Sequence, residues 1–277
     1  MEQLKQLLTA AGIAYKENEP LAAHCTFKIG GPARLFVQPV DHAQLCRAVA
    51  LCKAQGVRYY LLGNGSNILF ADEGYNGAVL DISSMQDAVE VHGTQLTAGA
   101  GVRLSALCKT ALEHSLTGLE FAYGIPGTVG GAVYMNAGAY GGEMKDVLTT
   151  VQYLTAEGEV KESAAAEFTL TPGEPEAIRA KMDELMAKRL DKQPLDKPSA
   201  GSTFKRPVGA FAAALIDQCG LRGYRHGGAA VSEKHCGFVV NLGGATCADV
   251  LALCEEVRTI VKEKTGYDLE KEIRVVR

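Results

Sequence analysis

Two glycine-rich segments hold the residues whose types and spacing are best suited to ligand binding. The first, Gly63-Asn64-Gly65-Ser66-Asn67, joins two short apolar runs and places hydroxyl and amide groups beside bare backbone N–H groups. The second, residues 116–143, interleaves glycines with apolar and aromatic anchors, unlike a flexible linker. Glycine permits positive φ and close approach, and successive N–H groups form concave anion sites. A large phosphate-bearing cofactor is one interpretation, and tight turns in a β-rich domain are the other.

Neither segment matches the common nucleotide-binding fingerprints. No Gly-Lys-Ser/Thr follows either one, as a P-loop requires. The nearest dinucleotide motif, Gly99-Ala100-Gly101, has Leu104 where its third glycine should be. A Rossmann-type helix N-terminus is therefore not expected to bind the cofactor.

Ser202 is the first candidate for chemistry outside these segments. Ala200 and Gly201 precede it, and Lys205 and Arg206 follow. It can be a nucleophile, although no Gly-x-Ser-x-Gly elbow surrounds it. It can instead donate a proton beside two anion-binding cations, or simply turn the chain.

Glu270 and Glu272 are the second candidate. On a strand near the C-terminus they share one face, and Lys271 takes the other. One of them can be a buried acid, and a solvated edge strand is the ordinary alternative.

Composition excludes several classes of protein. The 277 residues include 28 Lys and Arg against 32 Asp and Glu, a net charge of −4 that disfavours a nucleic-acid surface. No apolar stretch reaches membrane-spanning length, and the N-terminus is typical of an amphipathic helix rather than a signal peptide. The eight cysteines form no CxxC pair, so we expect reduced thiols in a cytoplasmic protein and no metal site. Four of them lie in helical patterns and are expected in the core: Cys46, Cys52, Cys108 and Cys254.

Hydrophobic periodicity and turn signals predict an α+β protein of about three lobes. Helices are predicted over residues 1–13, 41–55, 104–114, 175–190, 210–219 and 248–264. Strands are predicted over residues 34–40, 57–62, 68–70, 149–154, 237–242 and 272–276, with a hairpin turn at residues 156–158. The proline-bearing stretch 191–202 is the candidate domain boundary.

Five segments in order resemble the UDP-N-acetylenolpyruvoylglucosamine reductase (MurB) family, second type. They are Thr26-Phe27-Lys28-Ile29-Gly30-Gly31-Pro32, residues 63–67, residues 124–142, Gln193-Pro194 with Ser199-Ala200-Gly201-Ser202-Thr203-Phe204-Lys205, and Leu269-Glu270-Lys271-Glu272-Ile273-Arg274. Each is weak singly, but the ordered set is specific and spans nearly the whole chain. The resemblance implies a two-lobed FAD-binding domain of the PCMH/vanillyl-alcohol-oxidase type and a C-terminal α+β substrate-binding domain. The expected division is 1–56, 57–190 and 191–277.

The resemblance also implies a reaction. NADPH reduces FAD and leaves, and UDP-N-acetylglucosamine enolpyruvate then takes a hydride at its β-carbon and a proton at its α-carbon. The product is UDP-N-acetylmuramate, a peptidoglycan precursor. A vinyl ether accepts hydride poorly unless its carboxylate takes up the developing charge, so the site must stabilise an enolate-like species.

By position, the resemblance makes Ser202 the proton donor and Glu272 the acid beside the substrate carboxylate. The expected cofactor-binding residues are Gly63, Asn64, Gly65, Ser66, Asn67, Gly124, Ile125, Pro126, Gly127, Gly130, Gly131, Asn136, Ala137 and Gly138. The expected substrate-binding residues are Lys205, Arg206, His235 and Gln193. No obligate protein partner is implied.

One departure from the family pattern follows Lys161. Roughly two dozen residues are missing there, including an arginine that the resemblance implies for the substrate carboxylate. Three explanations stay open: the sequence omits a loop, the deletion is real, or another arginine serves in place of the missing one. Two further interpretations stay open: an FAD oxidase of the same fold, and an impaired flavoprotein that only binds nucleotide-sugar.

Overall fold

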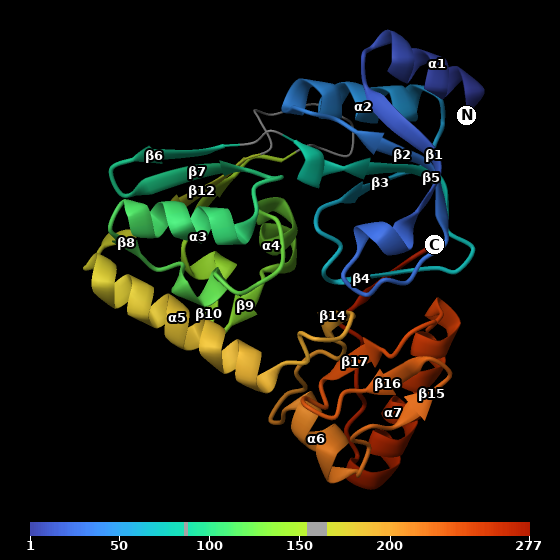
Figure 1. Cartoon of the computed structure of the whole chain (residues 1–277), viewed down its shortest axis with the longest axis vertical. Helices are drawn as coiled ribbons and strands as arrows, with labels where there is room; N and C mark the ends of the chain where they lie inside the picture. The colour runs from blue at the N-terminus through green and yellow to red at the C-terminus, as the bar shows by residue number, and fades with distance from the viewer. Residues whose placement is uncertain (86–87, 154–164) are drawn as a thin grey trace. The chain divides into compact units, whose positions relative to one another are not determined.

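The computed structural model describes residues 1–85, 88–153 and 165–277 of the chain (Figure 1). They form two compact units. Unit 1 comprises residues 1–17, 35–64 and 77–189, and unit 2 comprises residues 18–34, 65–76 and 190–277.

Helices and strands are mixed along the described residues. The helices are α1 (Glu2–Ala10), α2 (His42–Ala54), α3 (Leu104–Glu113), α4 (Val129–Met135), α5 (Pro175–Lys192), α6 (Ala212–Gln218) and α7 (Cys247–Thr265). The strands are β1 (Ala14–Pro20), β2 (Pro32–Gln38), β3 (Tyr59–Leu62), β4 (Ile68–Phe70), β5 (Tyr75–Asp81), β6 (Val89–His92), β7 (Gln95–Gly99), β8 (Leu116–Thr117), β9 (Gly138–Ala139), β10 (Gly142–Glu143), β11 (Leu148–Val151), β12 (Ala165–Thr169), β13 (Thr171–Pro172), β14 (Ser199–Ser202), β15 (Arg225–His226), β16 (Ala229–Val231), β17 (Phe238–Asn241) and β18 (Arg274–Val276).

The first sheet of unit 1 has the strand order β1-β2-β5-β3. Helices α1 and α2 cover it (Figure 1), and their apolar residues share one core with the sheet. Asp41 caps α2 by accepting a hydrogen bond from the Gln44 N–H at 2.8 Å. Capping satisfies a backbone donor that the helix itself cannot. The members of this core include Leu4, Leu8, Leu35, Leu45, Val49 and Leu80.

The second sheet of unit 1 has the order β11-β12-β7-β6, with antiparallel neighbours. Residues of α3, α4 and α5 pack with it in a second core. The buried stripe of α3 repeats at three- and four-residue intervals, as an amphipathic helix requires. Among the members are Leu96, Leu107, Cys108, Val129, Phe168 and Met182.

Unit 2 is built on an antiparallel sheet of order β14-β17-β16-β15 and a parallel pair, β4 with β18. Helix α7 buries one apolar face, which includes Val250, Leu253 and Val257. A reciprocal capping box of Thr246 and Asp249 begins it, and Gly266 ends it with φ 80°.

The α+β class is confirmed, and each predicted helix is present with shifted ends. The final strand begins only at Arg274, so the prediction that Glu272 lies within it is wrong. Helix α4 lies inside the second glycine-rich segment, where no helix was expected. The predicted hairpin turn at 156–158 lies outside the described residues.

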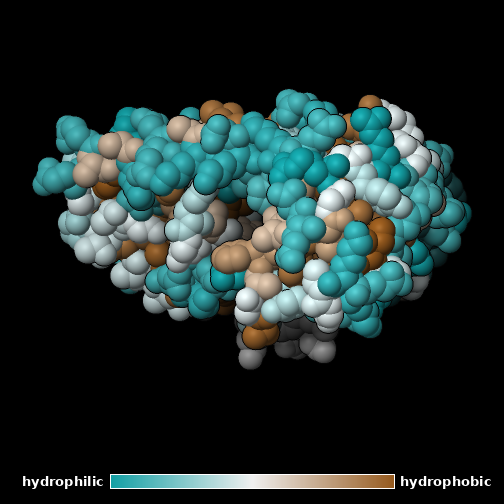
Figure 2. All heavy atoms as spheres, turned by 90° about the horizontal axis from the view of Figure 1, so that it is seen from below, coloured by the Kyte–Doolittle hydropathy of each residue, from teal (hydrophilic) through white to brown (hydrophobic). Residues whose placement is uncertain are grey.

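All eight cysteines are free, and seven of them are buried. Cys46 is only partly buried, so its expected place in the core is wrong. On the face seen in Figure 2, hydrophobic residues lie among many hydrophilic ones. In the described part of the chain, no helix has the length and apolar character needed to cross a bilayer.

Candidate active site

Ser202 and Glu272, the expected catalytic residues, lie on neighbouring backbone segments of unit 2. Phe204 and Lys271 form an antiparallel bridge. The Glu272 N–H donates a hydrogen bond to the carbonyl oxygen of Thr203 at 2.8 Å. Ser202 is exposed, and its hydroxyl makes no hydrogen bond within the described residues. The Ser202 hydroxyl is therefore available to a ligand. Ser202 immediately precedes Thr203, the residue whose carbonyl accepts from Glu272.

Thr203 is the residue that joins these segments, and sequence analysis gave it no role. Only 1% of it is exposed. Its N–H donates to the Gly237 carbonyl at 2.8 Å, and its Oγ1 accepts from the Val239 N–H at 2.9 Å. Because its carbonyl also accepts from Glu272, Thr203 links the end of β14 to β17 and to the C-terminal segment.

Glu272 lies in a surrounding that favours its protonated form. Burial raises the pKa of its carboxyl group above the ordinary value, and the charge of Lys205 opposes that shift. The Lys205 ammonium is itself paired with the exposed carboxylate of Glu270. A proton-bearing carboxyl can donate a hydrogen bond to a ligand carboxylate, which an ionised one cannot.

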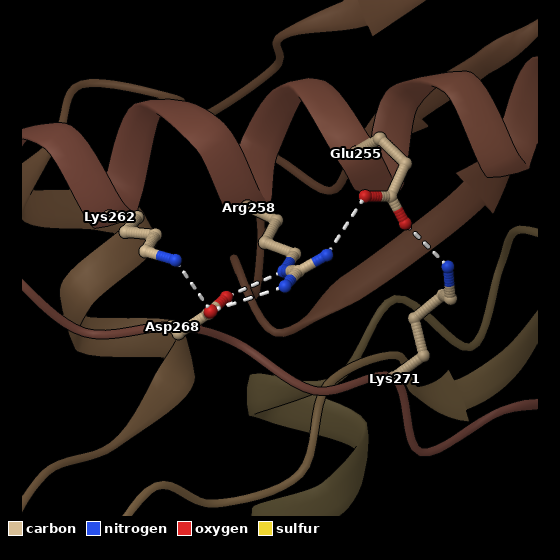
Figure 3. Close-up of polar contacts among 5 residues, drawn as sticks. All are labelled: Glu255, Arg258, Lys262, Asp268 and Lys271. Carbon is tan, nitrogen blue, oxygen red and sulfur yellow. Dashed lines mark hydrogen bonds and ion pairs between the residues drawn. The ribbon is translucent and has the colours of Figure 1, made fainter.

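The segment that leads to Glu272 is tied to α7 by a chain of ion pairs (Figure 3). Asp268 accepts from Arg258 Nε at 2.5 Å and from Lys262 Nζ at 2.9 Å. Glu255 accepts from Lys271 Nζ at 2.6 Å and from Arg258 at 3.3 Å. The Arg258 hydrogen bond is the main cause that lowers the pKa of Asp268. Asp268 and Lys271, which flank residues 269 and 270, are thereby held against α7.

His235 sits in a turn just before β17. The Ser232 hydroxyl accepts hydrogen bonds from the N–H groups of Lys234 and His235 at 3.1 and 3.2 Å. The His235 Nδ1 accepts from the Gly237 N–H at 3.2 Å, so the ring proton of the neutral form is on Nε2. Burial lowers the pKa of the imidazole. The Nε2–H of neutral His235 can therefore donate a hydrogen bond to a ligand.

Arg206 and Gln193, both expected to bind substrate, lie on different parts of unit 2. The Arg206 guanidinium stacks 4.0 Å from the ring centroid of Phe211. No carboxylate pairs with it among the described residues, so it is available to an anion. Gln193 is half-buried, and no hydrogen bond within the described residues joins it to Ser202 or Glu272.

The last part of the first glycine-rich loop also belongs to unit 2. The Gly65 carbonyl accepts from the Thr26 N–H at 3.2 Å, and the Thr26 hydroxyl donates to the Ser199 carbonyl at 2.6 Å. Thr26, which carries no predicted function, thus connects this loop to the strand that ends at Ser202. Within the described residues, the N–H groups of Gly65 and Ser66 donate no hydrogen bond.

Asn67 connects the same loop to the C-terminal segment. Its carbonyl accepts from the Arg274 N–H at 3.0 Å, and its Nδ2 donates to the Glu272 carbonyl at 3.4 Å. The parallel pairing of β4 with β18 continues this contact. Unit 2 therefore holds one cofactor-binding candidate directly against the backbone of Glu272.

Unit 1 brings the first part of that loop to the second glycine-rich segment. Asn64 Nδ2 donates to the Pro126 carbonyl at 2.6 Å. A Cβ on Gly63 would lie 2.4 Å from Thr128 Oγ1, so glycine at this position leaves room for the buried Thr128 side chain. The two segments predicted to bind one cofactor do meet.

Several N–H groups of the second segment already have acceptors in the protein. Those of Gly127, Val129 and Gly130 donate to the carbonyls of Ile125, Val102 and Ala100 at 2.8–2.9 Å. A Cβ on Gly130 would lie 2.8 Å from that of Ala100. At these positions the glycine-rich backbone packs against other residues of the protein and not against a ligand. The backbone donors still available to a ligand here include Gly124, which donates to no acceptor among the described residues.

Asn136, Ala137 and Gly138 lead into the β9–β10 hairpin. Asn136 ends α4 with φ 45°. Its Nδ2 donates to Glu143 Oε2 at 2.8 Å, and its Oδ1 accepts from the Lys145 N–H at 2.9 Å. The Asn136 side chain therefore orders the hairpin, and its expected contact with the cofactor stays a prediction.

The donors of these segments fit a phosphate-bearing flavin cofactor. The positive φ of Gly65 (60°) and its unpaired N–H beside that of Ser66 suit an anion. Unit 1 also holds a buried arginine whose Nε has no hydrogen-bond partner. Among the described residues, no group of three or more His, Cys, Asp or Glu could hold a metal ion.

Comparison with known proteins accounts for both parts of the chain. A family model described as FAD binding domain matches residues 33–164, and one described as UDP-N-acetylenolpyruvoylglucosamine reductase, C-terminal domain, matches residues 193–276. An FAD-binding domain followed by this C-terminal domain is the expected fold, and it is confirmed.

Relatives match from end to end. The UDP-N-acetylenolpyruvoylglucosamine reductase of Caldanaerobacter subterraneus subsp. tengcongensis is 44% identical over all of this chain and 97% of its own. The alignment has 297 positions, 20 more than this chain has residues, so at least 20 residues of the relative have no counterpart here. The enzyme of Lachnoclostridium phytofermentans is 45% identical over all of this chain and 96% of its own.

A solved structure agrees with them. The crystal structure of UDP-N-acetylenolpyruvylglucosamine reductase (MurB) from Thermus caldophilus is 31% identical, covers 96% of this chain and 99% of its own, and superposes with a TM-score of 0.75. With relatives of this name matching its whole length, the chain belongs to the UDP-N-acetylenolpyruvoylglucosamine reductase family.

Proposed function

We propose that this protein is an FAD-dependent oxidoreductase that uses NADPH to reduce UDP-N-acetylglucosamine enolpyruvate to UDP-N-acetylmuramate, in the synthesis of peptidoglycan precursors. The observation that carries the proposal is the match of relatives of that name to the whole chain at 44–45% identity. When bound, FAD supplies the hydride chemistry, accepting a hydride from NADPH and delivering one to the enolpyruvyl double bond.

Ser202 donates the proton that balances the hydride. Hydride addition at the β-carbon leaves an electron pair at the α-carbon, and protonation there completes a two-electron reduction. The support is the exposed Ser202 hydroxyl, which has no hydrogen-bond partner within the described residues, beside a fixed backbone. Positioned acids of this kind typically accelerate a reaction about 10²–10⁴-fold.

Glu272 and His235 act on the substrate carboxylate. The raised pKa of Glu272 favours the form that donates a hydrogen bond, and His235 offers its Nε2–H. Donors aimed at the carboxylate stabilise the charge that develops during hydride transfer. Arg206 and Lys205 bind the diphosphate, for which the unpaired and stacked Arg206 is the better prepared of the two.

The remaining assignments are part of the same proposal. Gln193 binds substrate, and residues 63–67, 124–127, 130, 131 and 136–138 bind FAD. Residues 1–56 and 57–190 are the two FAD-binding lobes, and residues 191–277 bind substrate. The free cysteines are typical of a reducing compartment, so we assign the protein to the cytoplasm.

A second candidate is an impaired flavoprotein that binds nucleotide-sugar without reducing it. It is favoured because 20 or more residues of the Caldanaerobacter enzyme have no counterpart in this chain. The resemblance places an arginine for the substrate carboxylate in the missing segment. The predicted place of this gap, after Lys161, lies outside the residues that the structure describes.

Anaerobic flavin spectroscopy tests the proposal. The purified protein reconstituted with FAD is expected to be bleached by NADPH, and one equivalent of the enolpyruvyl substrate should restore the oxidised spectrum. The product should be two mass units heavier than the substrate. Re-oxidation only by oxygen would indicate the oxidase, and substrate binding without re-oxidation would indicate the impaired flavoprotein; either result contradicts the proposal.

A further inference from the structure

Arg189, near the end of α5, is a buried cation without an ionic partner. Only 8% of the residue is exposed. Its Nε is buried and has no hydrogen-bond partner, the one such side-chain nitrogen or oxygen found in the described ranges. No carboxylate lies within ion-pair distance of it among those residues. Arginine does not lose its proton in proteins, so this charge is permanent.

The guanidinium lies against the second glycine-rich segment of unit 1. A Cβ on Gly124 would be 2.9 Å from Arg189 Nε and 3.0 Å from Arg189 Cδ. Glycine at this position therefore lets the arginine approach the backbone. Burial lowers the pKa of Arg189, and an interaction with Tyr140 of the same segment opposes that shift. The arginine thus lies close to the backbone of this segment at Gly124.

Such an arrangement is costly for the protein alone. Removing an ion from water carries a large penalty, and no carboxylate of the described residues offsets it here. Buried charges are ordinarily paired or bind a ligand. An anion that arrives with a ligand supplies what Arg189 lacks.

We propose that Arg189 binds an anionic oxygen-bearing group of the FAD cofactor. This inference rests on the proposed use of FAD. The FAD-binding family model ends at residue 164, so the match to that model does not assign Arg189. Two groups of FAD share the required chemistry: the diphosphate, and the pyrimidine edge of the flavin ring, which gains negative charge on reduction.

Three variants separate this role from a structural one. Arg189→Met removes the charge and retains the apolar stem, and Arg189→Lys retains the charge without the planar fork. Arg179→Met is the matched control, because Arg179 is exposed on the same helix. The measurements are thermal unfolding of the apo-protein and FAD affinity by flavin fluorescence.

The expected result has opposite signs in the two measurements. Apo-protein carrying Arg189→Met should be at least as stable as the wild type, because an unpaired buried charge is gone. Its FAD dissociation constant should rise about 30-fold or more, as when one partner of a buried charge pair is truncated. Arg189→Lys should lie between, and Arg179→Met should match the wild type in both measurements.

ADP binding and the flavin midpoint potential distinguish the two cofactor groups. If the diphosphate is bound, ADP affinity falls with that of FAD and the potential is unchanged. If the flavin ring is bound, ADP affinity is unchanged and the potential falls by about 30 mV for each tenfold loss specific to reduced FAD. Either pattern supports the proposal.

Unchanged FAD affinity and potential in Arg189→Met would overturn the proposal. So would an apo-protein that is destabilised or unfolded by this change, because Arg189 would then be structural. A loss confined to affinity for the enolpyruvyl substrate would also contradict it. If wild type and Arg179→Met both fail to bind FAD, the proposed function itself is at fault.

Discussion

Glu272 experiences two opposing effects on its carboxyl group. Burial is the larger effect and raises its pKa, while Lys205 acts in the other direction. The Lys205 ammonium is shared with Glu270, which limits the charge that it offers to Glu272. A residue held in this way can carry a proton under conditions where an ordinary glutamate is ionised.

Glu272→Gln is expected to change the pH dependence of stability. Wherever the folded state holds this proton more tightly than the unfolded state, stability falls as pH rises. The wild type therefore loses stability above the ordinary glutamate value of 4.5, and the glutamine variant does not lose this part. The unfolding temperature of the variant relative to the wild type should increase from pH 4 to pH 7. Glu270→Gln removes an exposed ion pair and serves as the control. A difference that is constant with pH would contradict the burial of Glu272.

At the scale of elements, unit 2 is held together by contacts between segments far apart in the chain. Asp72, just after β4, accepts hydrogen bonds from the N–H groups of Cys247 and Ala248 at 2.7 and 3.0 Å. It therefore caps α7 from 175 residues away, in addition to the local capping box. A carboxylate at a helix N-terminus also interacts favourably with the helix dipole.

Replacing Asp72 with alanine should destabilise the protein by about 1–2 kcal/mol, the usual cost of losing a cap. Denaturant unfolding measures this change. The neighbouring Glu73→Ala, also at an exposed residue, is the control and should change stability by less than about 0.5 kcal/mol. Equal effects of the two variants would show that the cap contributes nothing.

Thr203→Val should cost about 1–3 kcal/mol, because it leaves the buried Val239 N–H without its acceptor. Thr203→Ser retains the hydroxyl and is expected to cost less. Chemical denaturation of both variants gives the comparison. If valine were tolerated as well as serine, the hydroxyl would not be what joins β14 to β17.

Sequence patterns predicted the elements with clear periodicity. The stripes of α2, α3 and α7 recur at helical spacing, so these helices were predictable with errors only at their ends. Helix α4 was not predictable, because Gly130 and Gly131 each disfavour a helix by about 1 kcal/mol. Tertiary contacts override that preference, since Gly130 is required beside Ala100.

The candidate site was predictable only through its ordered motifs. The resemblance assigned roles to Ser202 and Glu272, and the structure places their backbones on adjacent segments. Nothing local in the sequence indicates Asp72, Thr203 or Arg189. Asp72 and Thr203 matter because of partners distant in the chain, and Arg189 because its buried Nε has no partner. Residue spacing in the sequence reveals neither.

At the scale of the whole molecule, the chain is shorter than the relatives that it matches. The alignments with the Caldanaerobacter and Lachnoclostridium enzymes have 297 and 301 positions against 277 residues. The resemblance assigns to the predicted gap an arginine for the substrate carboxylate. Without a cation opposite it, a buried substrate carboxylate is bound much less tightly.

This difference predicts a selective weakness toward one substrate. Compared with the Caldanaerobacter enzyme, the KM for the enolpyruvyl substrate should be higher by a factor of about 10 or more, as for the loss of about 1.4 kcal/mol of binding. Flavin reduction by NADPH should be similar in the two proteins. Inserting the relative's extra segment after Lys161 should lower the KM of this protein. Equal KM values would indicate that another cation serves the carboxylate.

The most direct test of the central claim measures the two half-reactions of Ser202→Ala by stopped-flow absorbance. Transfer from NADPH to the flavin needs no protonation at carbon, so flavin bleaching should proceed at nearly the wild-type rate. Re-oxidation by the enolpyruvyl substrate should slow by about 10²-fold or more, the contribution expected of a general acid. Equal slowing of both half-reactions, or no change in either, would contradict the assignment of Ser202 as the proton donor.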